Sequence, residues 1–356
     1  MSTQPSDITP GPVPLHQMTP DQHGDTFALL SDRHEARTKD DRPYFRVTFR
    51  DAKRSAVAML WHDHGLFADC QDNWKVGTFY KLRCRYTENS YGSQLDIDRL
   101  RPVDESDRET GFREDNFYAT SRYDRGVMFQ QLLDLVHEHI TEEPLQQLVV
   151  GLLTEHAEQI QQHSAAMRNH HAFAGGYLEH TLSVTKNALF FADRYADYYT
   201  DMRPILSKSL VVAGAVLHDI GKLEELEFKP EGWVYTARGR LVGHILIGRD
   251  MVREKAREIT DLDPETLLRL EHMIISHQNL PEWGSPIAPH TPEAMLVHFA
   301  DDLDAKFHEL AVQLEARWPD GTEFTDRKNP LRRSIFIGLS QEASESDAES
   351  GSSDPE

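Results

Sequence analysis

The sequence predicts a multidomain protein in which a small all-β barrel precedes an all-α helical bundle. Three observations support this fold class. The chain has 356 residues, enough for two or three domains. Between about residues 24 and 103, apolar and polar side chains alternate with the two-residue period of strands. Beyond about residue 125, apolar residues recur at steps of three and four, which is the period of a helix.

Changes in composition set the expected domain boundaries. Residues 1–23 are rich in proline and polar residues and are predicted to form a flexible or partly ordered lead-in. The barrel is expected over 24–103, followed by a charged, turn-rich linker over 104–124. The helical domain is expected over 125–336. Residues 337–356 are mostly serine, glutamate, aspartate and glycine, a composition that predicts a disordered acidic tail.

The first domain is predicted from runs of alternating residues. These runs cover residues 43–51, 55–61, 78–86 and 94–100. About five short strands within about 80 residues are typical of a small Greek-key barrel. Four aromatic residues fall on the inward face of these runs and are assigned to the core: Phe45, Phe49, Tyr80 and Tyr86.

The second domain is predicted from helical periodicity. Apolar residues repeat from Met128 to Ile140 and again from Leu145 to Leu153. Further helices are expected at 178–195, 205–218, 242–259, 264–276 and 292–314.

Composition also excludes whole classes of protein. The 39% of hydrophobic and 27% of charged residues are typical of a globular protein. The longest apolar runs are far shorter than the roughly 18–20 residues of a membrane span, so no membrane partner is expected. Two cysteines cannot form a disulfide framework, and we expect a cytoplasmic protein.

The strongest chemical feature is the run Leu-His-Asp-Ile-Gly-Lys that ends at Lys222. The predicted apolar helix ends in His218 and Asp219. Packing of a core helix does not require this polar pair, whereas binding of an ion does. Imidazole nitrogen and carboxylate oxygen are ligands of divalent metal ions. His180 lies near the start of another predicted helix, and Asp301 lies on a later one. The alternative interpretation is a simple hydrogen bond between a histidine and a carboxylate at a helix end.

The order of these residues resembles the signature of the HD-domain metal-dependent phosphohydrolases. The resemblance extends to His244 and His277, where binuclear members place further ligands; core or solvated histidines are the alternative. It implies that six residues hold one or two divalent ions, Mn²⁺ or Mg²⁺, with Asp219 bridging them. The six implied ligands are His180, His218, Asp219, His244, His277 and Asp301.

Several blocks narrow the resemblance to the YhaM-type 3′–5′ exoribonucleases. They are Asn-His-His at 169–171, Gly-Tyr-Leu-Glu-His-Thr at 176–181, Gly-His-Ile at 243–245, and residues 276–286 and 299–306. That family joins an OB-fold nucleic-acid-binding domain to an HD domain. The implied function is metal-dependent 3′–5′ hydrolysis of single-stranded RNA, with single-stranded DNA as a further candidate, to nucleoside 5′-monophosphates. Gln278 stands where the family pattern often has a second histidine after His277, which leaves a second ion open.

The mechanism that follows assigns further roles in this region. Asp219 and Lys222 are the candidate catalytic residues, since the ammonium of Lys222 can stabilise charge that develops on the phosphate. A solvated cation at a helix end is the alternative for Lys222. Asp304 lies three residues after Asp301 and is expected to orient a histidine.

The barrel is expected to grip the nucleic acid through its outward face. The net charge of −21 argues against a simple nucleic-acid-binding module, but residues 28–103 contain 14 basic and 11 acidic residues. An ordinary solvated surface is the alternative. The candidate nucleic-acid-binding residues are Tyr44, Arg46, Arg50, Trp61, Lys81, Arg83 and Arg85, with Phe79 as a further ring for base stacking.

Two other functions remain open at this point. The first is an HD-domain phosphohydrolase that acts on nucleotides or cyclic dinucleotides, with the OB-like domain as a regulatory module. The second is a nucleic-acid-binding scaffold with an inactive metal site. A homo-oligomer is also left open.

Overall fold

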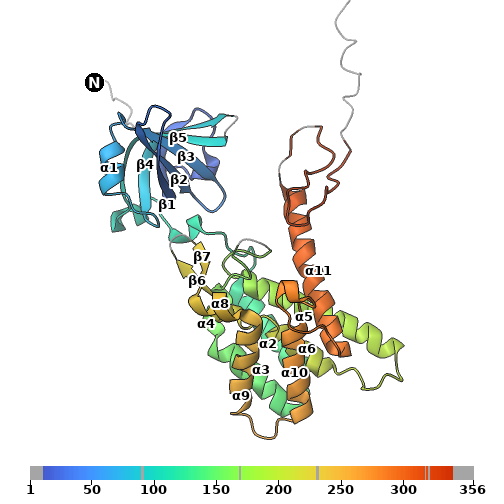
Figure 1. Ribbon diagram of the computed structural model, residues 1–356. Coiled ribbons are helices and arrows are strands. Elements are labelled where there is room, and N and C mark those ends of the chain that lie inside the picture. Colours follow the sequence, from blue (N-terminus) through green and yellow to red (C-terminus); the bar gives the residue numbers. More distant parts are fainter. Residues whose placement is uncertain are drawn as a thin grey trace, which may run out of the picture.

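Both predicted domains are present in the computed structural model (Figure 1). The structure describes residues 11–89, 92–167, 170–229, 232–316, 318–319 and 321–339. The predicted acidic tail lies outside the described residues from position 340 onward, and so do the first ten residues of the predicted lead-in.

Five strands form the first domain. They are β1 (His23–Arg37), β2 (Pro43–Arg50), β3 (Ser55–Trp61), β4 (Phe79–Asn89) and β5 (Gly92–Pro102). Their order is β1-β2-β3-β5-β4, and β4 pairs again with β1. The β3–β5 seam is parallel and rests on one bridged pair, Val57 with Gln94. Helix α1 (Phe67–Asp72) follows β3. This topology of five strands with one weak seam is that of an OB-fold.

Alternation along the strands fills the barrel as predicted. The four aromatic residues assigned to the core are at most 3% exposed, because every second side chain of a strand points to the same face. Trp74, which follows α1, joins them with its ring 6.0 Å from that of Phe49.

Of the two forms predicted for the lead-in, residues 11–22 have the ordered one. A short 3₁₀ helix, η1 (Leu15–Gln17), brings Leu15 and Met18 into the barrel core, where both are buried. Arg54 donates hydrogen bonds to the carbonyl oxygens of these two residues, at 2.9 and 2.6 Å. Two apolar side chains three residues apart are enough to anchor a segment whose composition is otherwise polar.

The linker packs against the barrel. It contains the 3₁₀ helices η2 (Glu105–Arg108) and η3 (Glu114–Phe117). Phe112 and Phe117 cover the outer face of the sheet, with ring centroids 5.3 and 5.1 Å from that of Phe79. The expectation that Phe79 stacks bases is therefore wrong: strand alternation identifies the outward face but not what covers it.

The second domain is a bundle around α6. Its helices are α2 (Arg125–His139), α3 (Glu143–Glu155), α4 (Ala157–Gln162), α5 (Gly176–Tyr198), α6 (Lys208–Leu217), α7 (Lys222–Glu225), α8 (Ala237–Val242), α9 (His244–Ala256), α10 (Pro264–Ser276) and α11 (Pro292–Glu315). Every residue of α6 from Ser209 to Leu217 is buried, and α2, α3, α5, α10 and α11 pack around it. Side-chain oxygens of Ser207, Asp263 and Thr291 cap α6, α10 and α11. None of the described helices meets the length and apolarity of a membrane span.

Several short elements of this domain were not predicted: the helices α4, α7 and α8 and one hairpin. Strands β6 (Leu226–Lys229) and β7 (Gly232–Tyr235) form an antiparallel hairpin. Four-residue strands are too short to show a two-residue period clearly in the sequence. The hairpin lies between the barrel and the helices (Figure 1).

Candidate metal centre

The centre is built at the end of the buried helix α6. His218 follows its last residue, and Asp219 begins the turn that leads to α7. Gly221 in this turn lies against the start of α9, where an added Cβ atom would be 2.0 Å from the carbonyl oxygen of His244. Only glycine permits this approach, which brings His244 toward Asp219.

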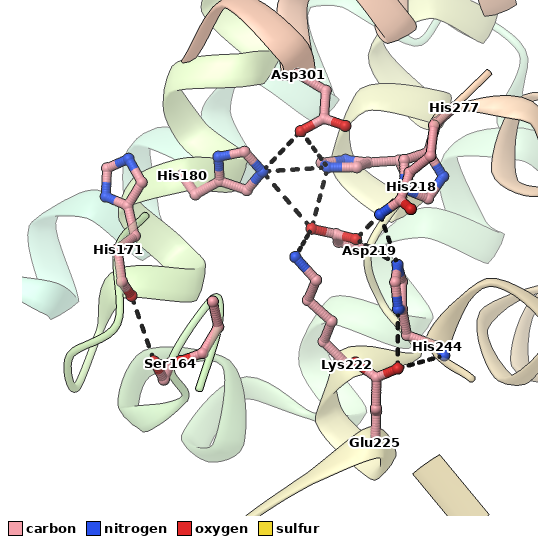
Figure 2. A network of polar contacts seen from close by, with 12 residues as sticks. Ser164, His171, His180, His218, Asp219, Lys222, Glu225, His244, His277 and Asp301 are labelled. Carbon is pink, nitrogen blue, oxygen red and sulfur yellow. Dashed lines mark hydrogen bonds and ion pairs between the residues drawn. The ribbon is translucent and has the colours of Figure 1, made fainter. Parts of the chain in front are cut away.

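One oxygen of Asp219 faces the first group of predicted ligands (Figure 2). Its Oδ2 lies 3.3 Å from Nε2 of His218 and 3.6 Å from Nε2 of His180. Oδ1 of Asp301 lies 3.2 Å from the same nitrogen of His180 and 3.8 Å from that of His218. We call His180, His218 and Asp219, with Asp301 beside them, the first triad.

The other oxygen of Asp219 faces a second group. Its Oδ1 lies 3.4 Å from Nε2 of His244 and 3.5 Å from Nε2 of His277. We call Asp219, His244 and His277 the second triad. Asp219 belongs to both triads, so its carboxylate lies where a group bridging two ions would lie.

Each of the four histidines is held from behind by an oxygen atom. The Nδ1 atoms of His180, His218, His244 and His277 lie 2.7 Å from Asp304 Oδ2, 2.7 Å from the Ala215 carbonyl, 3.0 Å from Glu225 Oε1 and 2.7 Å from the Ile274 carbonyl. Such acceptors keep the proton on Nδ1 and leave the lone pair of Nε2 facing the centre. This is the tautomer that binds metal ions through Nε2.

Two buried atoms at the centre support this interpretation. Among the described residues, Oδ1 of Asp219 and Nε2 of His277 have no hydrogen-bond partner. A buried polar atom without a partner is destabilising, and native proteins contain few of them. A divalent cation between the triads would satisfy both atoms with ligand types that it accepts. The residues therefore fit a metal ion.

Electrostatics keep Asp219 ionised and His277 neutral. Burial favours a lower pKa for His180, but Asp219, Asp301 and Asp304 raise it well above its usual value, so a bound ion would displace a proton from that ring. Burial favours a higher pKa for Asp219, but the Lys222 ammonium at 2.6 Å and His218 outweigh it and hold that pKa well below its usual range. Burial favours a lower pKa for Lys222, yet Asp219 raises it, so the ammonium stays charged. Burial lowers the pKa of His277, which favours its neutral form.

A hollow of about 430 Å³ opens beside the centre. Lys222, His244, His170 and Gln278 contribute to its lining, and Trp283 lies at the same hollow with half its surface exposed. The side-chain amide nitrogen of Gln278 is 3.3 Å from Nε2 of His244. Gln278 thus lies next to the second triad, at the position where the family pattern often has a histidine.

Comparison with known proteins gives the family. The model of the HD domain matches residues 177–306, which contain all six predicted ligands. The 3′–5′ exoribonuclease YhaM of Bacillus subtilis (strain 168) is 30% identical over 330 residues, covering 91% of this chain and 96% of the relative. The chain belongs to the YhaM family. YhaM of Bacillus licheniformis is also 30% identical, over 328 residues and the same shares of both chains.

The likeness to solved structures covers about a quarter of the chain. The second OB-fold domain of replication protein A from Methanococcus maripaludis aligns with 26% of this chain and 95% of its own length, at 14% identity and a TM-score of 0.21. The predicted resemblance to YhaM-type enzymes is confirmed by the relatives and the HD-domain match.

Two residues outside the ligand set position the YhaM-family centre. Asp304 was expected to orient a histidine, and it accepts from His180 and lies 3.1 Å from Nε2 of His171, with a further bond from Ser183. Glu225 was not predicted. It accepts from both the backbone and the ring of His244, and its signal in the sequence was its place three residues after Lys222, on the same short helix.

The predicted nucleic-acid-binding residues separate into two sets. Tyr44 and Trp61 form a pair across β2 and β3 on the outside of the barrel, with ring centroids 5.0 Å apart. Arg46 is exposed on the same face of β2. Strands 2 and 3 are the usual oligonucleotide-binding face of an OB-fold.

The remaining predicted cations have partners. Lys81 lies 3.1 Å from Asp107, Arg83 lies 3.3 Å from Asp25, and Arg85 lies 2.7 Å from Asp21. These carboxylates offset the charge that the cations present to a phosphate. Arg50 instead packs over the ring of Tyr118 and donates to the carbonyl of Phe117 at 2.9 Å, at the junction of the domains.

Proposed function

We propose that this protein is a metal-dependent 3′–5′ exoribonuclease that hydrolyses single-stranded RNA to nucleoside 5′-monophosphates, with single-stranded DNA as a further substrate. The observation that carries the proposal is the pair of triads that share Asp219 at the end of α6. Relatives that match 91% of the chain are named for 3′–5′ exoribonuclease activity.

The six predicted ligands would hold one or two divalent ions, Mn²⁺ or Mg²⁺. Such ions polarise a phosphoryl group and lower the pKa of a bound water molecule. The first triad, with Asp301, offers two nitrogen and two carboxylate ligands. The second triad offers two nitrogens and the shared carboxylate, and an amide beside it in place of an imidazole. Metal analysis of the purified protein distinguishes one ion from two.

Lys222 is the proposed phosphate-binding group of the chain. Its ammonium is nearly buried, contacts Asp219 and lines the hollow at the centre. In such a water-poor environment a fixed positive charge stabilises negative charge that develops on phosphate oxygens. Asp219 orients this ammonium through their contact.

The barrel is the proposed binding domain for the single-stranded RNA. Tyr44 and Trp61 offer ring faces to bases, and Arg46 offers a charge to phosphates. Arg50, Lys81, Arg83 and Arg85 remain proposed contacts, the last three weakened by their carboxylate partners. The proposed boundaries remain the barrel over 24–103, the linker over 104–124 and the HD domain over 125–336.

An incubation of 5′-labelled single-stranded RNA and DNA with each metal ion tests the function. We expect a descending ladder with Mn²⁺ or Mg²⁺, lost on chelation. We expect Asp219→Ala to lower the rate by about 10³-fold or more, since both triads lose a ligand. Asp193→Ala, at an exposed ion pair on α5, is the control and should keep the wild-type rate. Intact oligonucleotide after incubation of the wild type with both ions would contradict the proposal.

The alternative HD-domain function is tested in the same experiment. A nucleotide or cyclic dinucleotide fits the same metal chemistry, but no feature of the centre favours it over an RNA end. Turnover of a cyclic dinucleotide in the absence of any ladder would favour that alternative.

Location and assembly complete the proposal. The two cysteines are buried and unpaired, and burial raises the pKa of both thiols to about 12, which fits the expected cytoplasmic location.

A homo-oligomer would cover the stripe of exposed Met295, Phe299, Leu303 and Phe307 on α11, and light scattering tests it.

A further inference from the structure

A second hollow, of about 690 Å³, lies between the two domains. Its lining combines Arg50 of the barrel, Tyr118 of the linker, Phe228 and Trp233 of the β6–β7 hairpin, and Arg125 and Met167 of the helical domain. Apart from Arg50, a proposed contact of the barrel, none of these residues has a role in the proposed function. Two arginines and no carboxylate are found among the described residues that line it. In a chain of net charge −21, such a lining favours an anionic occupant.

Aromatic rings form a continuous series across this hollow. The ring of Tyr118 is 4.7 Å from that of Phe228 at 77°, and Phe228 is 5.2 Å from Trp233 at 58°. Arg50 lies over the ring of Tyr118 at 5.4 Å. Although it touches both neighbours, Phe228 remains 48% exposed. Exposed ring faces beside arginines are the combination with which proteins bind single-stranded nucleic acids.

The hollow adjoins, on one side, the hollow beside the metal centre. Met167 lines both this hollow and the hollow that contains Lys222 and His244. On the other side it reaches the barrel, because Tyr44, Arg46 and Arg50 alternate along β2 and so lie on one face of that strand. An extended chain that leaves the metal centre therefore meets the rings of the hairpin before it meets the pair formed by Tyr44 and Trp61.

We propose that the interdomain hollow is a subsite for single-stranded RNA, in which bases upstream of the 3′ end stack on Phe228 and Trp233 while Arg50 and Arg125 bind the phosphates. The subsite rests on the proposed function, since it gives the substrate a path from the barrel to the metal centre. It assigns a role to the hairpin, which the family resemblance does not.

The test compares substrates of two lengths. The quantity measured is kcat/KM for a 12-nucleotide RNA divided by kcat/KM for a dinucleotide, which reaches only the metal centre. Phe228→Ala and Trp233→Ala should each lower this ratio about tenfold, because each removes one stacking face. Trp233→Phe keeps a ring and should keep most of the ratio. Phe190→Ala is the matched control, since Phe190 is an exposed phenylalanine on α5 that lines neither hollow, and its ratio should equal that of the wild type.

A binding measurement separates this inference from the proposed function. Fluorescence anisotropy of a labelled 12-nucleotide RNA in chelator needs no hydrolysis, and Phe228→Ala should weaken binding about tenfold relative to Phe190→Ala. Arg125→Gln, which leaves the hairpin intact, should weaken binding and lower the slope of log K against log salt by about 0.7. The subsite would be overturned if the folded variants kept the kcat/KM ratio and the RNA affinity of the wild type, even if the wild type degrades RNA. The variants are Phe228→Ala, Trp233→Ala and Arg125→Gln. Failure of the wild type to degrade RNA while the variants lose binding would overturn the proposed function and retain the subsite.

Discussion

At the metal centre, the atom behind each histidine decides which nitrogen faces the cation. His218 and His277 use carbonyl oxygens three residues earlier in their own helices. His180 and His244 use carboxylates from other elements, Asp304 on α11 and Glu225 on α7. The second kind of support can be removed by substitution while the ligand itself remains, so it can be tested.

Asp304→Asn should weaken metal binding or activity by about 10- to 100-fold, because the amide orients His180 less firmly and makes it a weaker ligand. Calorimetric titration with Mn²⁺ and kcat/KM for RNA measure the two effects. Asp302→Asn is the control: Asp302 is two residues away on the same helix and pairs with Lys306 at the surface. Equal metal affinities for the two variants would contradict the role of Asp304.

The barrel cations should differ in their contribution to RNA binding. Arg46→Ala should lower the slope of log K against log salt by about 0.7, because an exposed arginine releases one counterion equivalent on binding. Lys81→Ala should change the slope much less, since Asp107 already neutralises Lys81. Anisotropy titrations at several salt concentrations measure both slopes, and a larger change for Lys81→Ala would refute this assignment.

The sequence was informative about these residues to different degrees. The ligands were predictable because His218 and Asp219 are adjacent and carry a specific motif. Glu225 was missed because a glutamate at a helix end has many ordinary explanations. Phe79 was misassigned because its cover, Phe112 and Phe117, lies more than 30 residues away in the chain.

At the scale of elements, the linker is held against the barrel by a buried carboxylate. Asp107 in η2 is buried and accepts two hydrogen bonds from Arg101 of β5 and one from Lys81 of β4. The bonds from Arg101, aided by Lys81, hold the pKa of Asp107 well below its ordinary value. One carboxylate thus fastens the start of the linker to two strands.

This pairing predicts a pH dependence of stability. An unfolded aspartate has a pKa of about 3.9, and the folded value of Asp107 is lower, so its contribution is complete above about pH 4. It is lost as the pH falls toward the folded pKa. Asp107→Asn should therefore lower the free energy of unfolding at pH 7, and its difference from the wild type should shrink below about pH 4. Denaturant titrations at pH 7 and pH 3 measure this, with Glu105→Gln, at an exposed ion pair, as the control. A difference that grows on acidification would contradict the assignment.

Elements were predictable where they are long enough to show a clear period and begin at a recognisable cap. Helix α10 has the predicted bounds, because Asp263 caps it, proline begins it and apolar residues repeat through it. The β6–β7 hairpin and helix α8 were missed because four to six residues hold too little periodicity. The hairpin nevertheless contacts the linker, where the ring of Phe228 packs against that of Tyr118.

At the scale of the molecule, the net charge of the chain and the local arrangement of its charges favour different partners. The net charge of −21 argues against a nucleic-acid partner, yet the interdomain lining has arginines and no described carboxylate. Composition cannot reveal this, because folding decides which charges share a surface. Hydrophobic periodicity likewise does not show that His180 and Asp301 meet at one centre. Only the family resemblance predicted this.

Removal of the metal ions should leave the fold intact. The bundle has a continuous apolar core around α6, and the histidines are already held by protein oxygens. Circular dichroism after chelation should therefore keep its helical signal. Added Mn²⁺ at about 100 times its Kd should stabilise the protein by about 2.7 kcal/mol, which raises the melting temperature. Loss of the helical signal on chelation would contradict this expectation.

The oxygens behind the four histidines have a consequence for how the enzyme obtains its ion in the cell. Since the polypeptide is already shaped for ligation, one cation can leave and another can enter without any rearrangement of the chain. The identity of the bound ion is then governed by supply rather than by folding, and the rate of RNA turnover would follow the divalent ion that the surroundings make most abundant.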